Sequence, residues 1–107
     1  MAATDSVADL VAPDLLPTLA TPSNLRLGRE IAEQAGVEIL EFGPLRVTAK
    51  VTGGQRRTVE LQATPAGLAW RCSCTRDRAL FCKHCVAAAI VTWEKAPARQ
   101  GPRQLGA

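Results

Sequence analysis

The chain has 107 residues, enough for one small domain and too few for two. Residues 1–20 carry three Asp and no Lys or Arg, whereas the remaining residues carry thirteen basic and seven acidic side chains, a net +6. This moderately basic part permits an anionic partner such as nucleic acid, and the lack of an apolar run of about 18 residues argues against a transmembrane helix.

The first 22 residues contain three Pro and three Asp and show no sustained hydrophobic period. We expect a flexible acidic leader here, although five of its apolar side chains could form a short adhesive element. Those side chains are Leu10, Val11, Leu15, Leu16 and Leu19. The leader lacks the basic n-region of a secretory signal, so we expect a reducing, cytoplasmic setting.

Helix signals begin after the leader, in residues 23–35. Ser23 is a suitable N-cap, and Leu27 and Ile31 begin an apolar stripe at four-residue spacing. Gly36 suits the position that follows a helix C-cap. The pattern predicts a short amphipathic helix that must pack against another element.

Apolar and polar residues then alternate, which predicts antiparallel strands. The predicted strands cover residues 37–40, 45–51, 59–63 and 68–74, with turns at Gly43–Pro44, Gly53–Gly54 and Pro65–Gly67. The order of helix, small antiparallel meander, cysteine-rich knuckle and C-terminal helix predicts an α+β domain over residues 23–96.

An Ala-rich segment, residues 86–96, follows without Gly or Pro and predicts a core-facing helix that Pro97 ends. Residues 97–107 resemble a flexible tail. Trp70 and Trp93 fall on the apolar faces of their elements, so we expect them in the core rather than as a base-stacking platform.

All four cysteines and the only histidine lie in one segment, CSCTRDRALFCKHC, residues 72–85. Cys72 and Cys74 are two apart on a predicted strand, so their side chains point to the same face. Residues 75–81 form a loop across which a second pair of ligands can reach the same ion. Sulfur and imidazole ligands in a tetrahedral arrangement suit zinc best among common cellular metals.

Other interpretations of the segment are weaker. A Cys72–Cys74 disulfide closes a very tight ring and is disfavoured in a reducing compartment. Redox catalysis fits the Cys-x-x-Cys spacing of residues 82–85, but it leaves the first two cysteines without a purpose. A catalytic zinc keeps an open position, whereas this segment has enough ligands to close the site, and Asp77 reads as a solvated loop residue. We therefore expect a structural zinc and no enzymatic activity.

Spacing leaves the fourth ligand open. If the last helix has begun by residue 82, Cys82 and Cys85 lie on one face and give a four-cysteine site. On a regular helix Cys82 and His84 point about 200° apart, and they converge only if Cys82 lies just outside the helix.

The arrangement Cys72-Ser-Cys74, seven residues, then Cys82-Lys-His84 resembles the C-x-C…C-x-H signature of the SWIM zinc finger family. The apolar run CVAAAIVTW after the histidine and the preceding hairpin ending, VELQATPAGLAWRCSC, are also similar to the family. The resemblance implies the metal ligands Cys72, Cys74, Cys82 and His84, and it makes Cys85 a packed helix-face residue that is the alternative fourth ligand.

The resemblance also implies a binding module that contacts DNA or protein, as such fingers do beside helicases, transposase relatives and recombination partners. No helicase or transposase segment is present in this chain, so we expect a small stand-alone finger. Arg outnumbers Lys ten to three and Ala is abundant, which is typical of a GC-rich bacterial source.

Four basic side chains surround the cysteine segment and are candidate contacts to nucleic acid or a partner: Arg71, Arg76, Arg78 and Lys83. They could instead stabilise the thiolates, because three thiolates and a neutral imidazole leave a zinc site with a net charge of about −1. The sequence predicts a zinc-binding, DNA-binding or DNA-associated accessory protein whose partner is DNA or a protein such as a helicase. The alternative is a protein-interaction adaptor; neither a membrane nor a small-molecule substrate is expected.

Overall fold

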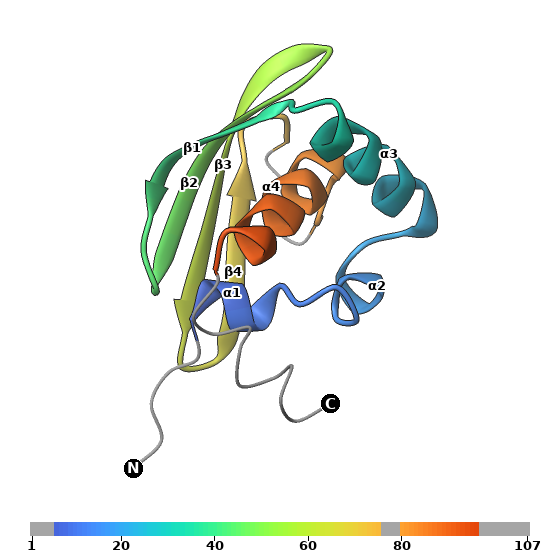
Figure 1. The fold of residues 1–107 in the computed structure, drawn as a ribbon. Helices are drawn as coiled ribbons and strands as arrows, with labels where there is room; N and C mark the ends of the chain where they lie inside the picture. The colour runs from blue at the N-terminus through green and yellow to red at the C-terminus, as the bar shows by residue number, and fades with distance from the viewer. Residues whose placement is uncertain (1–5, 76–79, 97–107) are drawn as a thin grey trace.

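The computed structural model describes residues 6–75 and 80–96 and shows a four-stranded sheet with helices on one face (Figure 1). The elements are α1 (Val7–Leu10), α2 (Leu16–Leu19), α3 (Pro22–Glu33), β1 (Val37–Phe42), β2 (Arg46–Gly53), β3 (Gln55–Thr64), β4 (Gly67–Cys72) and α4 (Lys83–Glu94). The predicted α+β class with an antiparallel meander and a C-terminal helix is confirmed. None of the helices in the described part of the chain has the length and apolar character that crossing a membrane requires.

The sheet is a simple antiparallel meander in the order β1-β2-β3-β4. Gly54, with φ 99°, joins β2 to β3, and Gly53 pairs with Gln55 at the end of that ladder. The β3–β4 turn closes at the Thr64–Gly67 pair, where Gly67 has φ 120°. Both glycines occupy the left-handed region that side chains with a Cβ rarely adopt, so the predicted turns rest on a conformational requirement.

Helix α4 forms the centre of the core. Its residues from His84 to Ala89 are all buried, and the inward side chains of β2 and β3 pack against it. Figure 1 shows α4 lying between the sheet and α3. A helix that is buried on all sides must be apolar on all sides, and the small Ala side chains let neighbouring elements approach closely.

Helix α3 packs along α4 through a close contact at Gly28. A Cβ at that position would lie 2.4 Å from Val86 Cγ1. Thr21, rather than the expected Ser23, caps the helix: its side chain accepts from the Asn24 amide at 3.2 Å, and Pro22 occupies the first turn. Proline at that position is pre-organised for a helix, which explains the earlier start.

The end of α3 also differs from the expectation. Ala35, not Gly36, takes the left-handed conformation, with φ 60°. Gly36 is instead required for a close approach, since a Cβ there would lie 2.8 Å from the Thr52 carbonyl oxygen. The Thr52 amide donates to the Gly36 carbonyl at 2.8 Å, and this bond ties the end of α3 to β2.

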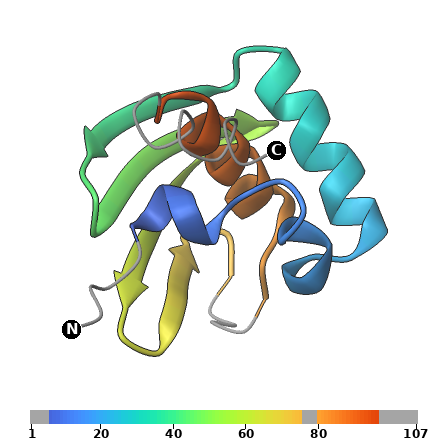
Figure 2. The same cartoon turned by 60° about the horizontal axis from the view of Figure 1, so that its bottom comes forward.

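The prediction of a flexible leader over residues 1–22 is wrong for residues 6–22. This segment contains α1, α2 and the start of α3. Ser6 and Asp9 make a capping box at α1, and the Val7 amide donates to the Pro44 carbonyl at 2.7 Å. Val7 and Val11 are fully buried. Figure 2 shows α1 lying beside α4 and the β3–β4 pair. These apolar residues cover an end of the core, which offsets the entropy of ordering the segment.

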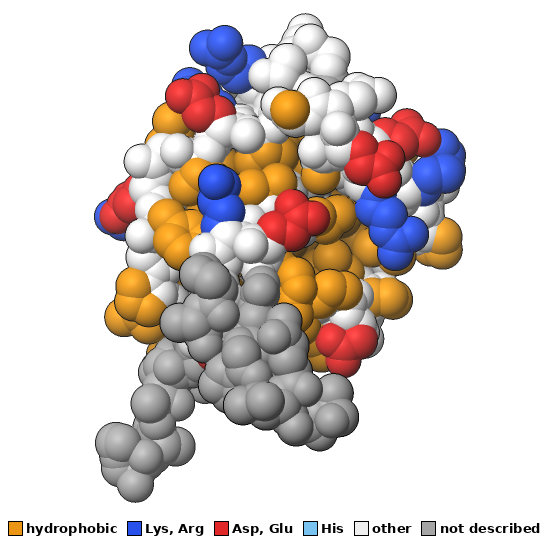
Figure 3. All heavy atoms as spheres, in the orientation of Figure 1, with side chains coloured by type: hydrophobic (Ala, Val, Ile, Leu, Met, Phe, Trp, Pro, Cys, Tyr) orange, Lys and Arg blue, Asp and Glu red, His pale blue; other side chains and the backbone are white. Residues whose placement is uncertain are grey.

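The tail expected over residues 97–107 lies outside the described part of the chain, as do residues 1–5. On the face that Figure 3 shows, acidic and basic side chains are interspersed around an apolar area. Among the described residues, neither sign of charge therefore dominates this face, whereas a surface that attracts a polyanion is predominantly positive.

Candidate metal centre

The four predicted ligands come from the two chain segments on either side of residues 75–81, the predicted loop that we call the knuckle. Cys72 is the last residue of β4, and Cys74 follows two residues later. Cys82 is the N-cap of α4, and His84 is the second residue of that helix. The end of an edge strand and the start of the central helix thus meet at one point.

The ligand atoms of Cys72, Cys74, Cys82 and His84 all lie within 4.8 Å of one another. The Cys74 and Cys82 sulfurs are 3.6 Å apart, and Cys82 Sγ is also 3.6 Å from His84 Nδ1. A tetrahedral zinc site separates two sulfurs by about 3.8 Å, and a sulfur from a nitrogen by about 3.5 Å. The measured separations match these edges, so the group can hold one metal ion such as zinc.

The backbone of Cys82 explains why Cys82 and His84 converge. Its φ of −77° and ψ of 176° are extended, and its side chain caps no amide of α4. The residue therefore lies just outside the helix, which is the condition under which two residues two apart can point to the same ion. Cys85 lies one position further into α4 and outside the four-residue group.

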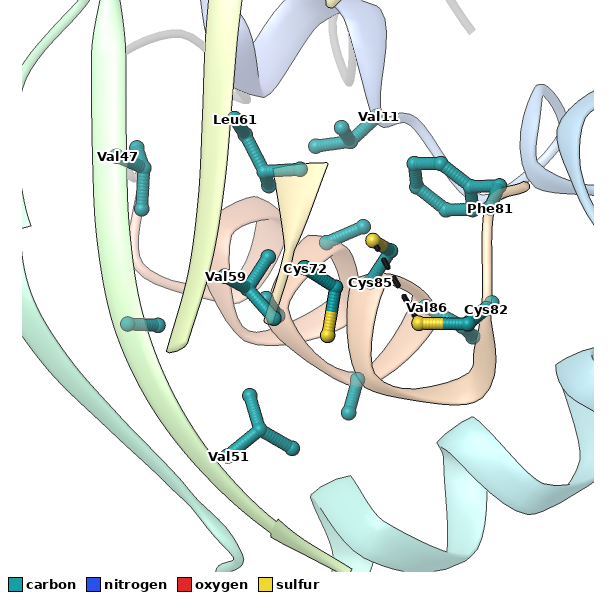
Figure 4. Close-up of a cluster of buried hydrophobic side chains, with 14 of the residues drawn as sticks. Val11, Val47, Val51, Val59, Leu61, Cys72, Phe81, Cys82, Cys85 and Val86 are labelled. Carbon is teal, nitrogen blue, oxygen red and sulfur yellow. Dashed lines mark hydrogen bonds between the residues drawn. The ribbon is translucent and has the colours of Figure 1, made fainter. Parts of the chain in front are cut away.

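Cys85 belongs to the apolar core. It is 0% exposed, and Figure 4 shows it among buried side chains, with its sulfur joined by a dashed line to that of Cys82. The two sulfurs are 3.9 Å apart. The structure thus brings together the ligand set implied by the C-x-C…C-x-H resemblance and leaves the alternative ligand next to it.

Ser73 fixes the orientation of the first two cysteines. Its amide donates to the Thr58 carbonyl at 3.0 Å, and its hydroxyl accepts from the Thr58 amide at 3.0 Å. These two bonds continue the β3–β4 ladder beyond the last strand residue, so Cys72 and Cys74 stay on the opposite face from Ser73. No pattern in the sequence predicts this role for Ser73.

The second pair of ligands is held by an aromatic contact. The Trp70 and Phe81 rings meet edge to face with centroids 5.0 Å apart, and Trp70 Nε1–H donates to the Leu80 carbonyl at 3.1 Å. Phe81 is buried, whereas Leu80 is partly exposed. Because Phe81 directly precedes Cys82, the bond and the ring contact tie the knuckle's return segment to β4. Only the apolar placement of Trp70, and not its N–H bond, follows from the sequence pattern.

Without a metal, the clustered donors share protons. Hydrogen bonds to Cys72 and Cys82 raise the pKa of His84 to about 9. Burial, followed by hydrogen bonds to Cys72 and Cys82, raises the pKa of Cys74 to about 12. Hydrogen bonds from Cys72 and Cys85 lower the pKa of Cys82, which favours its thiolate form. A divalent cation would replace the shared protons, and its binding would release them.

Two of the four basic candidates, Arg71 and Lys83, lie among the described residues. Arg71 is exposed on the outer face of the sheet and pairs with Glu60, which also pairs with Arg46 at 3.6 Å. Lys83 is the first residue of α4. Arg76 and Arg78, with Asp77 between them, lie outside the described residues.

Comparison with protein-family models found no match. Searches of curated proteins and of solved structures likewise found none.

Proposed function

We propose that this protein is a zinc-binding module in which Cys72, Cys74, Cys82 and His84 hold one structural Zn²⁺. The observation that carries the proposal is the convergence of three sulfurs and one imidazole nitrogen within 4.8 Å, with Cys82 Sγ at 3.6 Å from both Cys74 Sγ and His84 Nδ1. Zinc accepts this donor set without redox chemistry or strong geometric demands, and thiolate-rich sites favour it over magnesium or calcium.

A structural role fits the position of the site better than a catalytic one. Cys72, Cys82 and His84 are buried, four protein ligands complete a tetrahedron, and no carboxylate belongs to the group among the described residues. The ion would join the end of β4 to the start of α4 beside the small core. A chain of this size gains stability from such a cross-link, so we propose a binding protein rather than an enzyme.

Cobalt substitution tests the site directly. Tetrahedral Co²⁺ with three thiolates and one imidazole gives intense visible bands and sulfur charge-transfer absorption, and stoichiometric Zn²⁺ should displace them. Weak octahedral spectra, or binding of more than one ion per chain, would contradict a closed site. Chelation of the zinc should also unfold the protein, because binding and folding free energies are linked.

We further propose that the module is a SWIM-type finger that acts as a DNA-binding or DNA-associated accessory protein. The C-x-C…C-x-H ligand order and the net +6 outside the first 20 residues support this role. A hollow beside β4 is lined in part by the hydroxyl groups of Thr48, Thr58 and Ser73, together with Arg71 and its ion-pair partner Glu60. Hydroxyl and guanidinium groups are the usual contacts to backbone phosphates.

DNA binding is testable through its salt dependence. Fluorescence anisotropy with single- and double-stranded DNA should show affinity that falls steeply between about 50 and about 200 mM salt. Replacing Arg76 and Arg78 with Ala should weaken binding and flatten this slope, whereas Arg26→Ala, an exposed position on α3, is the matched control. Undetectable binding to either form of DNA at the lower salt concentration would refute the DNA-binding role.

A second candidate is a protein-interaction adaptor in which zinc only supports folding. Three apolar side chains at the end of β1 and in the turn after it are exposed: Leu40 at 50%, Phe42 at 46% and Leu45 at 54%. The ion pairs of Arg46 and Arg71 with Glu60 also reduce the positive charge available to a polyanion. The alternative gains support if the protein binds no DNA and Phe42→Ser abolishes capture of a protein partner, since exposed apolar groups mark such interfaces.

A further inference from the structure

Cys85 is the one cysteine of the chain that lies outside the metal-binding group. It is fully buried in the first turn of α4, and its sulfur lies 3.9 Å from that of the ligand Cys82. Figure 4 shows this pair at the edge of the apolar cluster. A ligand sulfur and a non-ligand thiol are therefore in van der Waals contact.

The backbone at this point suits a bond between the two sulfurs. Cys82 is extended at the N-cap and Cys85 is the third residue of α4, so the pair has the Cys-x-x-Cys arrangement of redox-active dithiols. A disulfide needs the sulfurs about 2.0 Å apart, which side-chain rotation can supply from 3.9 Å without unwinding the helix.

Cys82 has a nearer sulfur neighbour, Cys74, at 3.6 Å. In a zinc-loaded site, however, Cys74 and Cys82 would both serve as metal ligands. Cys85 lies outside the ligand group, and its sulfur contacts that of Cys82. It is therefore the thiol that can react with Cys82 while the other ligands stay on the ion.

We propose that hydroperoxides regulate this site by converting Cys82 and Cys85 into a disulfide, which releases the zinc. The inference rests on the proposed zinc function and assigns that site a reversible redox control. The zinc-bound dithiol form would predominate in a reducing environment, and the zinc-free disulfide form would predominate in an oxidising one.

The chemistry balances with peroxide as the oxidant. The Cys82 thiolate attacks one peroxide oxygen, the O–O bond breaks, and Cys82 sulfenic acid and hydroxide form. The Cys85 sulfur then attacks the Cys82 sulfur, the S–O bond breaks, and the departing hydroxide takes the Cys85 proton as water. One thiolate and one thiol lose two electrons in total, and one hydrogen peroxide becomes one water and one hydroxide.

Loss of Cys82 leaves the ion with Cys72, Cys74 and His84. Three protein ligands make an open site with lower affinity, so the metal dissociates to a competing chelator. A dithiol reductant regenerates both thiols, and added zinc then restores the closed site.

The test treats the zinc-loaded full chain with hydrogen peroxide and follows zinc release with a chromogenic chelator. Trypsin cleaves after Lys83, so Cys82 and Cys85 fall in separate peptides, residues 79–83 and 84–95, while Cys72 and Cys74 share residues 72–76. We expect release to parallel formation of a cross-link between the peptides 79–83 and 84–95, and a reductant with zinc to reverse both. Cys85→Ala should release zinc several-fold more slowly.

Cys85→Ser serves as the second variant, because it keeps the side-chain size if Ala leaves a destabilising cavity. Release from either zinc-loaded variant at the wild-type rate would overturn the inference, as would a cross-link to residues 72–76 in place of residues 84–95. Zinc-loaded wild type that resists peroxide overturns the redox control alone. Untreated wild type that holds no zinc overturns the proposed function as well.

Discussion

Substitution of Gly28 by Ala should disturb the metal centre from a distance, through the contact between α3 and α4. The new Cβ would lie 2.4 Å from Val86 Cγ1 and 2.9 Å from the Lys83 carbonyl oxygen. Carbon atoms pack at about 3.5–4.0 Å, so the helices must separate by roughly an ångström. The carbonyl belongs to the first turn of α4, which carries His84.

The magnitude follows from two opposing effects. Overpacking a tight contact costs about 1–3 kcal/mol, whereas Ala gains about 1 kcal/mol over Gly in a helix interior. We expect a net loss of up to about 2 kcal/mol in the free energy of unfolding and a weaker zinc affinity. Denaturant titration of the zinc-loaded protein and a competition titration with a chromogenic chelator measure the two quantities.

The double variant Gly28→Ala with Val86→Ala is the matched control. Val86→Ala removes Val86 Cγ1, the nearest atom that the new Cβ meets, but leaves Val86 Cβ and the Lys83 carbonyl oxygen in place. The double variant should therefore lose somewhat less than the sum of the single losses. A Gly28→Ala protein that is more stable than wild type, by the amount expected from helix propensity, would refute the close approach of α3 and α4.

Three further outcomes test other parts of the structure. Val11→Asp should lower the free energy of unfolding by several kcal/mol because it buries a charge, whereas Leu15→Asp at a partly exposed position should lower it little. Equal, small effects of the two substitutions in thermal melts would instead support a flexible leader. Trp70→Phe should lose about 1 kcal/mol with the bond to the Leu80 carbonyl, and unchanged denaturant stability would contradict that role. Zinc affinity should fall as the pH falls from about 8 to about 6. The pKa of His84 is raised to about 9 in the metal-free cluster, so its proton competes increasingly with the ion over this range. A zinc affinity that a chelator titration finds independent of pH would contradict this competition.

The sheet and the last helix could be predicted from the sequence because their patterns are local. Alternation in residues 45–51 and 59–63 reflects strands with one buried face, and the glycine turns set the hairpin registers. The pairing of Glu60 with Arg71 follows from the Thr64–Gly67 turn, although it becomes visible only once that register is known. Such pairs decide whether an arginine is available to a ligand.

The leader could not be predicted from its own residues. Val7 and Val11 are four apart, but proline breaks the pattern before a second helical turn confirms it. Their burial depends on an open core end beside α4, which is a tertiary property. The Thr21–Pro22 helix start, in contrast, is a local signal of an N-cap followed by proline that could have identified the boundary.

The identity of the fourth ligand depends on the residue at which α4 begins, and the residue types do not specify that boundary. Whether Cys82 belongs to α4 or precedes it decides between His84 and Cys85, and cysteine is not a recognised capping residue. The structure starts the helix at Lys83, and the extended backbone at Cys82 brings its sulfur to within 3.6 Å of the imidazole. The separation of the two candidate ligands is therefore a consequence of one residue's φ and ψ.

The central claim is tested most directly by the metal content of wild type, His84→Ala and Cys85→Ser, measured by elemental analysis after dialysis against a weak chelator. We expect one zinc per chain in wild type and in Cys85→Ser, and loss of stable zinc in His84→Ala. The reason is that His84, and not Cys85, places its donor atom in the four-residue group. Zinc retained by His84→Ala and lost from Cys85→Ser would contradict this expectation and establish a four-cysteine site.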